Sequence, residues 1–303
     1  MLAPLYHRNP LLIPKLASHV AGQSLAKART VKSLEVVAEL LASTDLRAAA
    51  AALDAATERA RAQEATQGPY PGMHKLLNNA AVVRARLGES TRAAALLDQA
   101  IEVAARADPP VPAGAHFLLG FNRAVLHELA GELAPAADTY RRMISEFPAY
   151  ADAYVRLAGV EHRTRGATAA SEVLARGLAV DALATDASLL CSEARMLEEL
   201  RDYAGAEALL KRAADALPRG RDDPYVQVLR GNLSLHAVPT VRDKADEERV
   251  DKLVGVAAGH YARALKNDPN NVFAASGLAA AMALSGEFQE AQAALAQVTM
   301  ELC

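Results

Sequence analysis

The sequence repeats one short pattern of small and bulky residues along most of its length. In each copy a small residue follows a turn, a bulky residue comes four positions later, and another small residue follows, as in residues 131–143, 166–177 and 286–298. The first small residues of the copies are Ala93, Ala136, Ala170, Ala206, Ala257 and Ala291, with spacings of 43, 34, 36, 51 and 34 residues. A basal period of 34 residues with loop insertions indicates an array of one structural unit.

Composition favours a helical unit. Alanine contributes 69 of the 303 residues, aromatic side chains make up 4%, and Trp is absent. Alanine is the best helix former, whereas large sheets need β-branched and aromatic residues. We therefore expect each unit to be two antiparallel helices, A and B, in which the small residue of helix B lets helix A approach closely. Proline should end helix B, at Pro148, Pro218 and Pro269.

Helix A carries its own small position, filled by Ala81, Ala124, Ala158, Ser192, Gly231 and Ala279. Bulky residues before it include Leu77, Leu157, Cys191 and Leu278, so we expect Cys191 to be a buried small hydrophobe rather than a redox group. A single helix pair cannot bury its apolar face alone, so about six units should stack. The period predicts an all-α fold, a tetratricopeptide-repeat (TPR) right-handed α-solenoid of antiparallel helix pairs.

Two regions are predicted along the chain. Residues 1–70 should hold N-terminal helices and an irregular TPR-like hairpin, with helices over 31–42 and 46–65. Residues 71–303 should form the TPR array, with a Pro-rich loop at 105–115 and a charged insert at 238–252. A mixed-charge insert is most often a solvated helix extension, and a partner contact is the less favoured interpretation.

The N-terminal segment has one-sided charge. No Asp or Glu precedes Glu35, and the basic residues there are Arg8, Lys15, Lys27, Arg29 and Lys32. This resembles an organelle transit peptide. We favour the simpler interpretation, a chance run on the first helices of the fold, because residues 11–28 already read as an amphipathic structural helix.

The remaining chemistry argues against catalysis. The net charge of −3 gives no overall nucleic-acid footprint, and Cys191 and Cys303 form no metal or disulfide spacing. The chain has no phosphate-binding glycine loop and no HExxH, CxxC or GxSxG motif, and none of its eight His pairs with a second ligand at helical spacing. We therefore predict no enzyme activity, metal, cofactor, small-molecule substrate or membrane contact, and nucleic acid only as an indirect partner.

A TPR array offers its concave surface, lined mainly by A helices, as a binding site. In the family, polar residues at the sixth and ninth positions of helix A often hold an extended peptide. Asn79, Asn122 and Arg156 occupy sixth positions and Asn232 a ninth, so these four are predicted to bind peptide. Solvated polar residues on an empty groove are an equally weighted alternative. The two-carboxylate clamp of co-chaperones is not expected, because Val82 and Asp152 replace required polar and basic residues.

Several stretches resemble one particular TPR family. The segments that carry the resemblance are Leu229-Arg-Gly-Asn-Leu233, Pro239-Thr-Val-Arg-Asp-Lys244, residues 261–268, residues 271–280 and Gly286-Glu-Phe-Gln-Glu-Ala291. Leu77-Asn-Asn-Ala-Ala81 and residues 147–157 agree in order. Together they resemble the large TPR subunit of the RNA polymerase II-associated factor (Paf) complex, which is a nuclear transcription-elongation assembly. That subunit has a similar charged insert at the same place inside a repeat. Ser188 departs from the pattern, because the family has Trp there.

The resemblance implies a non-catalytic scaffold in the nucleus. Its partners would be other Paf complex subunits and the RNA polymerase II machinery, and it would support histone modification. The alternative is a TPR adaptor or co-chaperone-like protein of cytosol or organelle, placed in the cytoplasm or mitochondrion. Because the sequence stops at Cys303 just after a B helix, we also expect self-association through an open apolar face at Leu278, Leu284, Leu295 and Val298.

Overall fold

The computed structural model of the chain describes residues 30–239 and 243–302, with side chains up to residue 296. Every regular element in these ranges is a helix. The fourteen α-helices described are α3 (Val31–Leu41), α4 (Leu46–Gln67), α5 (Met73–Arg86), α6 (Ser90–Arg106), α7 (Ala113–Leu129), α8 (Leu133–Glu146), α9 (Ala151–Arg165), α10 (Ala167–Leu178), α11 (Ala187–Glu199), α12 (Tyr203–Ala216), α13 (Pro224–His236), α14 (Lys244–Asn267), α15 (Val272–Leu284) and α16 (Phe288–Leu302). Two short 3-10 helices, η1 (Asp181–Leu183) and η2 (Gly220–Asp222), lie in connections.

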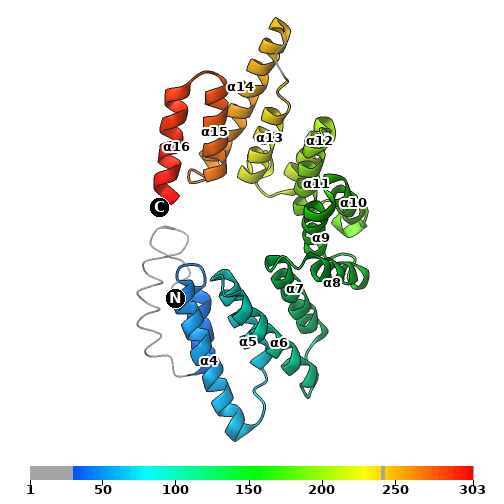
Figure 1. Ribbon diagram of the computed structural model, residues 1–303, viewed down its shortest axis with the longest axis vertical. Coiled ribbons are helices and arrows are strands. Elements are labelled where there is room, and N and C mark those ends of the chain that lie inside the picture. Colours follow the sequence, from blue (N-terminus) through cyan, green and yellow to red (C-terminus); the bar gives the residue numbers. More distant parts are fainter. Residues whose placement is uncertain (1–29, 240–242, 303) are drawn as a thin grey trace. The chain divides into compact units, whose positions relative to one another are not determined.

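The chain divides into two compact units, with the boundary between Thr139 and Tyr140 inside α8. Helices α3 to α7 belong to the first unit, and α9 to α16 belong to the second. Consecutive helices pair as hairpins, α3 with α4 and α5 with α6 in the first unit, and α9 with α10 through α15 with α16 in the second (Figure 1). Each hairpin packs on the next one in its unit. The domain limit expected at residue 70 stays a prediction.

The repeat pattern marks the helix contacts, as the sequence predicts. All six first small residues of the B helices, from Ala93 to Ala291, are buried, with at most 4% of their surface exposed. The bulky residues four positions later are equally buried in five of the six copies, at 0–1% exposed; these are Leu97, Tyr140, Leu174, Leu210 and Tyr261. Close helix approach at alanine and filling of the adjacent groove therefore build the core.

The helix ends also follow the sequence. Pro148, Pro218 and Pro269 each lie two residues beyond the ends of α8, α12 and α14. Several helices begin with an acidic or amide cap; the Asp223 side chain, for example, accepts hydrogen bonds from the backbone of Tyr225 and Val226 before α13. The hairpins therefore have defined starts and stops.

The first hairpin forms close to its expected bounds. Helix α3 ends at Leu41 and α4 begins at Leu46, after Asp45 caps the backbone N–H of Ala48 at 2.9 Å. The run of alanines at 48–52, whose register the sequence leaves open, buries Ala49, Ala50 and Ala52. These residues join one core cluster with side chains of α3, α5, α6 and α7.

Six pairs of described helices contact as hairpins within the two units, which agrees with the expected number of about six. One expectation needs correction. The small position of α11 is Ala194, 2% exposed, and not Ser192, which is half-buried. Ala194 lies twelve residues before Ala206, the same separation as between Ala81 and Ala93. Cys191 is nevertheless buried, as expected.

The charged insert extends helix B. Asp243 caps the backbone N–H of Asp246 at 2.9 Å, so α14 begins at Lys244, inside the segment expected as the charged insert. Residues 244–252 are helical and mostly exposed, so the insert extends helix B, as the favoured interpretation expects; whether it contacts a partner stays a prediction. The candidate transit peptide, the helix expected over 11–28, residues 240–242 and the side chain of Val298 lie outside what the structure describes.

Candidate peptide-binding site

The A helices lie next to one another within each unit. Helix α5 contacts α7 in the first unit, and α9, α11, α13 and α15 contact in succession in the second. All four residues predicted to bind peptide lie on A helices. Asn79 and Asn122 belong to the first unit, and Arg156 and Asn232 belong to the second, so each pair is described separately.

The first unit links its amides across two helices. Nδ2 of Asn122 on α7 donates to Oδ1 of Asn78 on α5 at 2.7 Å, and Nδ2 of Asn78 donates to Oδ1 of Asn79 at 3.4 Å. Asn78, which the sequence analysis did not single out, is 5% exposed and carries the link. Asn79 is exposed, so its amide group can serve a ligand. In the sequence, the only sign that Asn78 belongs to this site is that it stands next to Asn79.

Two cavities adjoin on this surface. One, of about 560 Å³, lies between α3 and α5 and is lined by Lys32, Glu35, Val36, Ala38, Glu39, Ala42, Leu53, Asn79, Val82, Val83 and Arg86. The other, of about 310 Å³, lies between α5 and α7 and includes Asn122 among mainly aliphatic residues. Val82 and Arg86 line both cavities. The first unit therefore offers an aliphatic groove edged by amides and charges.

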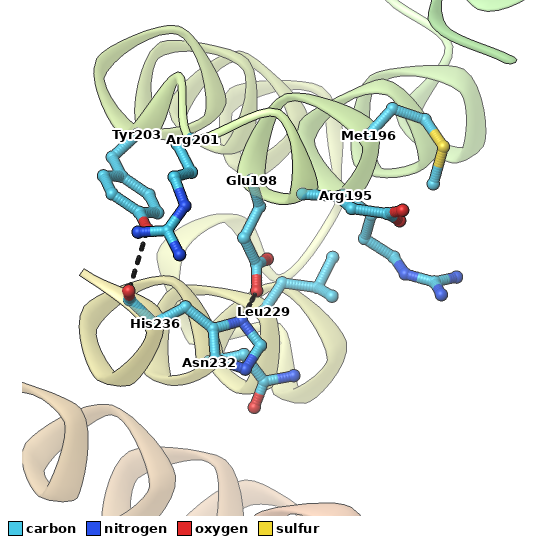
Figure 2. Close-up of a pocket in the computed structure, with 9 residues that line it drawn as sticks. Arg195, Met196, Glu198, Arg201, Tyr203, Leu229, Asn232 and His236 are labelled. Carbon is cyan, nitrogen blue, oxygen red and sulfur yellow. Dashed lines mark hydrogen bonds and ion pairs between the residues drawn. The ribbon is translucent and has the colours of Figure 1, made fainter. Parts of the chain in front are cut away.

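The second unit has a more polar cavity of about 460 Å³ between α11 and α13 (Figure 2). Helix α11, the α11–α12 turn, α12 and α13 all contribute side chains. The lining residues are Arg195, Met196, Glu198, Glu199, Arg201, Tyr203, Leu229, Asn232 and His236. Of the predicted pair, Asn232 lines this cavity and Arg156 does not. We call this cavity the α11–α13 pocket.

Asn232 is held in one orientation. The buried hydroxyl of Tyr261 on α14 donates to Oδ1 of Asn232 at 2.7 Å. Burial, with a contribution from the negative charge of Glu198, raises the pKa of Tyr261 to about 12, so the phenol keeps its proton at neutral pH. With Oδ1 occupied, the Nδ2 group of Asn232 is the donor that remains for a ligand.

Polar contacts connect the side chains at the rim of the α11–α13 pocket. The Tyr203 hydroxyl donates to the backbone oxygen of His236 at 2.8 Å, and Nδ1 of His236 pairs with Glu198. On the other side, Nε2 of His162 on α9 lies 2.7 Å from Oε2 of Glu199. Glu198 and Glu199 are thus each paired with a histidine. The sequence gives no signal for Glu198, Tyr203 and His236, because their partners lie more than 30 residues away along the chain.

Arg156 lies elsewhere on the second unit. It is exposed on α9, near the start of that helix and close to Tyr150. Burial and Asp152 raise the pKa of Tyr150, and the positive charge of Arg156 opposes this shift. The structure therefore does not bring Arg156 and Asn232 into one cavity, and the role of Arg156 stays a prediction.

Other chemistry in the described residues is limited. Burial raises the pKa of the Cys191 thiol to about 12, so it stays protonated and unreactive at neutral pH. No group of three His, Cys, Asp or Glu residues within the described ranges is placed to hold a metal ion. Likewise, none of the helices searched there is long and apolar enough to cross a membrane.

The apolar surface expected on the last helix pair is present in part. Leu284 and Leu295 are 55% and 47% exposed, and Phe273 and Phe288 are more exposed still. Leu278 is partly buried and packs against the core cluster that contains Tyr261. Self-association through these residues stays a prediction.

Helix pairs stacked at a 34-residue period define the fold as a TPR α-solenoid. Yeast Tom70 is a solved structure of this kind; it superposes with a TM-score of 0.65 at 16% identity, covering 94% of this chain and 54% of that one. At this level of identity the match speaks for the fold alone.

Sequence relatives are also TPR proteins. Tetratricopeptide repeat protein 1 of Schizosaccharomyces pombe is 25% identical over 226 residues, which cover 74% of this chain and 21% of that protein. Protein CTR9 homolog of Arabidopsis thaliana is 29% identical over 182 residues, which cover 59% of this chain and 16% of that protein. The chain thus spans about one fifth of the length of the curated relatives it matches. No family model matches the chain.

Proposed function

We propose that the chain is a non-catalytic TPR scaffold that binds extended segments of protein partners along its A helices. The observation that carries this proposal is the α11–α13 pocket, where Asn232 is fixed by Tyr261 so that its amide nitrogen can donate to a partner. A partly buried donor that is already oriented before binding loses little entropy when it meets a backbone carbonyl or carboxylate. The relatives, which are TPR proteins and indicate no enzyme family, agree with a scaffold.

The first unit would contribute a second contact surface. The exposed amide of Asn79 lies beside the aliphatic residue Val82, and Asn122 lies in the neighbouring cavity. An extended peptide could place an apolar side chain in the mainly aliphatic cavity between α5 and α7 while Asn79 bonds its backbone. Arg156, exposed on α9, would add a charged contact to the second unit.

We further propose that the scaffold works in the nucleus as a subunit of the Paf transcription-elongation complex. Support comes from the sequence resemblance and from the 29% identity with the CTR9 homolog, the counterpart of that subunit in Arabidopsis thaliana. The partners would then be other Paf complex subunits and the RNA polymerase II machinery, and histone modification would depend on the assembled complex.

Affinity purification of the tagged chain followed by mass spectrometry tests both levels of the proposal. Recovery of Paf complex subunits would support the nuclear assignment, and a mitochondrial signal from a fluorescently tagged chain would contradict it. The groove assignment is tested with Asn79→Ala, which removes an exposed amide. It should reduce partner recovery, whereas Gln67→Ala, an exposed amide at the end of α4, should not. Equal recovery with both variants would disprove a role for Asn79.

A further inference from the structure

Arg201 has an unusual backbone for its residue type. Among the described residues it is the one non-glycine with a positive φ, 64°. It is the second residue after helix α11. Glycine fills the same place after α5, α7 and α15, where Gly88, Gly131 and Gly286 have φ of 80°, 78° and 84°. The left-handed conformation crowds the Cβ atom of an L-residue, so arginine at this place is strained and glycine is not.

The turn itself does not require arginine. The backbone N–H of Arg201 donates to Glu198 at 3.0 Å, and that of Asp202 donates to Leu197 at 2.8 Å. Gly131 and Glu132 make the same pair of bonds at 3.1 and 2.8 Å after α7. Since glycine makes this turn without strain, the side chain of Arg201 needs another explanation, and strained residues often belong to binding sites.

The side chain of Arg201 enters the α11–α13 pocket. Figure 2 shows it reaching from the α11–α12 turn toward His236, beside Tyr203, while Arg195 extends to the other side. Its guanidinium makes no hydrogen bond or ion pair with any residue that the structure describes. The two nearby carboxylates, Glu198 and Glu199, are each paired with a histidine instead.

The pocket thus presents two donors that still lack acceptors. One is the guanidinium of Arg201, and the other is the Nδ2 group of Asn232, whose Oδ1 is occupied by Tyr261. A planar guanidinium forms paired hydrogen bonds with a carboxylate. A phosphate, which carries about two negative charges at neutral pH, would also face Glu198 and Glu199. A singly charged carboxylate is therefore the better match.

We propose that the α11–α13 pocket binds an acidic side chain of a partner segment. The guanidinium of Arg201 would donate paired hydrogen bonds to the carboxylate, and Asn232 would donate one more. Resting on the proposed scaffold function, this inference names the chemistry that the pocket selects. Arg201 acts as the residue that determines specificity, because Arg195, the other arginine of the lining, bonds to Tyr225. The strained turn is kept because glycine would leave the pocket without its unpaired cation.

Fluorescence anisotropy with the full chain tests the proposal. The probe is a short fluorescein-labelled peptide of alternating Glu and Gly, compared with a twin that carries Gln in place of Glu. The wild-type chain should bind the Glu peptide about tenfold more tightly than the Gln twin, because one charge-assisted contact accounts for such a ratio. Arg201→Gly and Arg201→Gln should both abolish the preference, and Arg201→Lys should retain part of it.

The control is Arg176→Gln, which removes the same charge from an exposed site on α10 and should keep the preference. If both peptides bind the wild type alike, the carboxylate assignment is wrong while the scaffold function stands. If neither peptide binds, the groove function fails as well. A phosphoserine-containing twin that binds more tightly than the Glu peptide would overturn the choice of carboxylate. Preservation of the ratio in Arg201→Gly would show that Arg201 does not set it.

Discussion

Gly231 on α13 lies directly against the ring of Tyr261 on α14. A Cβ atom added to Gly231 would stand 2.5 Å from Cε1 of Tyr261, and one added to Gly277 on α15 would meet the same ring. The ring is thus held between glycines of two successive A helices, and it is 1% exposed. This close approach positions the Tyr261 hydroxyl on Asn232, so packing and the binding surface depend on each other.

Replacing Gly231 with alanine should therefore destabilise the protein. The ring cannot move away because Gly277 confines its other side, so overpacking should lower the free energy of unfolding by about 2 kcal/mol. Urea denaturation measures this change. Gly255→Ala on α14 is the matched control: its site is open, and alanine there should raise stability by about 0.5–1 kcal/mol. A Gly231→Ala variant as stable as the wild type would contradict the packing argument.

Tyr261→Phe separates the hydroxyl from the ring. The variant keeps the packed ring but leaves Oδ1 of Asn232 without its donor, so we expect a loss of about 1 kcal/mol in the free energy of unfolding. The amide of Asn232 would also be free to turn, which should weaken partner capture. Tyr225→Phe, at a tyrosine that is 53% exposed, should change stability much less. Comparable losses in the two variants would show that the hydroxyl of Tyr261 contributes nothing specific.

The alanine pattern allowed the helix contacts to be predicted because each contact needs a small residue at a fixed place. It misplaced the small position of α11, where Ser192 and Ala194 both satisfy the size requirement. Counting twelve residues back from Ala206 would have identified Ala194. The positive φ of Arg201 could also have been predicted from the sequence, because Gly88, Gly131 and Gly286 occupy the same place in the corresponding turns.

The polar contacts of the candidate site could not be predicted in the same way. Asn122 bonds to Asn78, 44 residues away, and Tyr261 bonds to Asn232, 29 residues away. Such pairs depend on how one hairpin is rotated against another, which periodicity does not determine. The sequence therefore predicts which polar residues stand on the A helices, whereas their hydrogen-bond partners follow only from the packed helices.

Glu193 should make stability depend on pH. Its side chain is 6% exposed on α11, Oε1 accepts from Ser171 at 2.6 Å, and Oε2 has no partner among the described residues. Burial raises its pKa above 4.5, and the Ser171 hydrogen bond opposes the shift. Between pH 4.5 and the raised pKa the folded state binds more protons than the unfolded state, so this group lowers stability as pH rises.

Glu193→Gln removes this titration and keeps an acceptor for Ser171. The variant should gain stability relative to the wild type as pH rises from acid to neutral, by about 1–2 kcal/mol, because the charged oxygen no longer has to be buried. Thermal unfolding at several pH values measures the difference. Glu172→Gln, at an exposed position on α10, should show no comparable change with pH. A constant difference between Glu193→Gln and the wild type would mean that Glu193 is not the titrating group.

Arg201→Gly should make the protein more stable. The turn keeps both backbone hydrogen bonds, and glycine removes the crowding of a Cβ atom at a φ of 64°, so the free energy of unfolding should rise by about 1 kcal/mol. Arg201→Gln retains the Cβ atom and should leave stability close to that of the wild type. Urea denaturation of the two variants separates backbone strain from side-chain charge. If Arg201→Gly is more stable and loses the preference for acidic peptides, arginine in this turn lowers stability while it supports binding. If Arg201→Gly is no more stable than the wild type, the turn is unstrained.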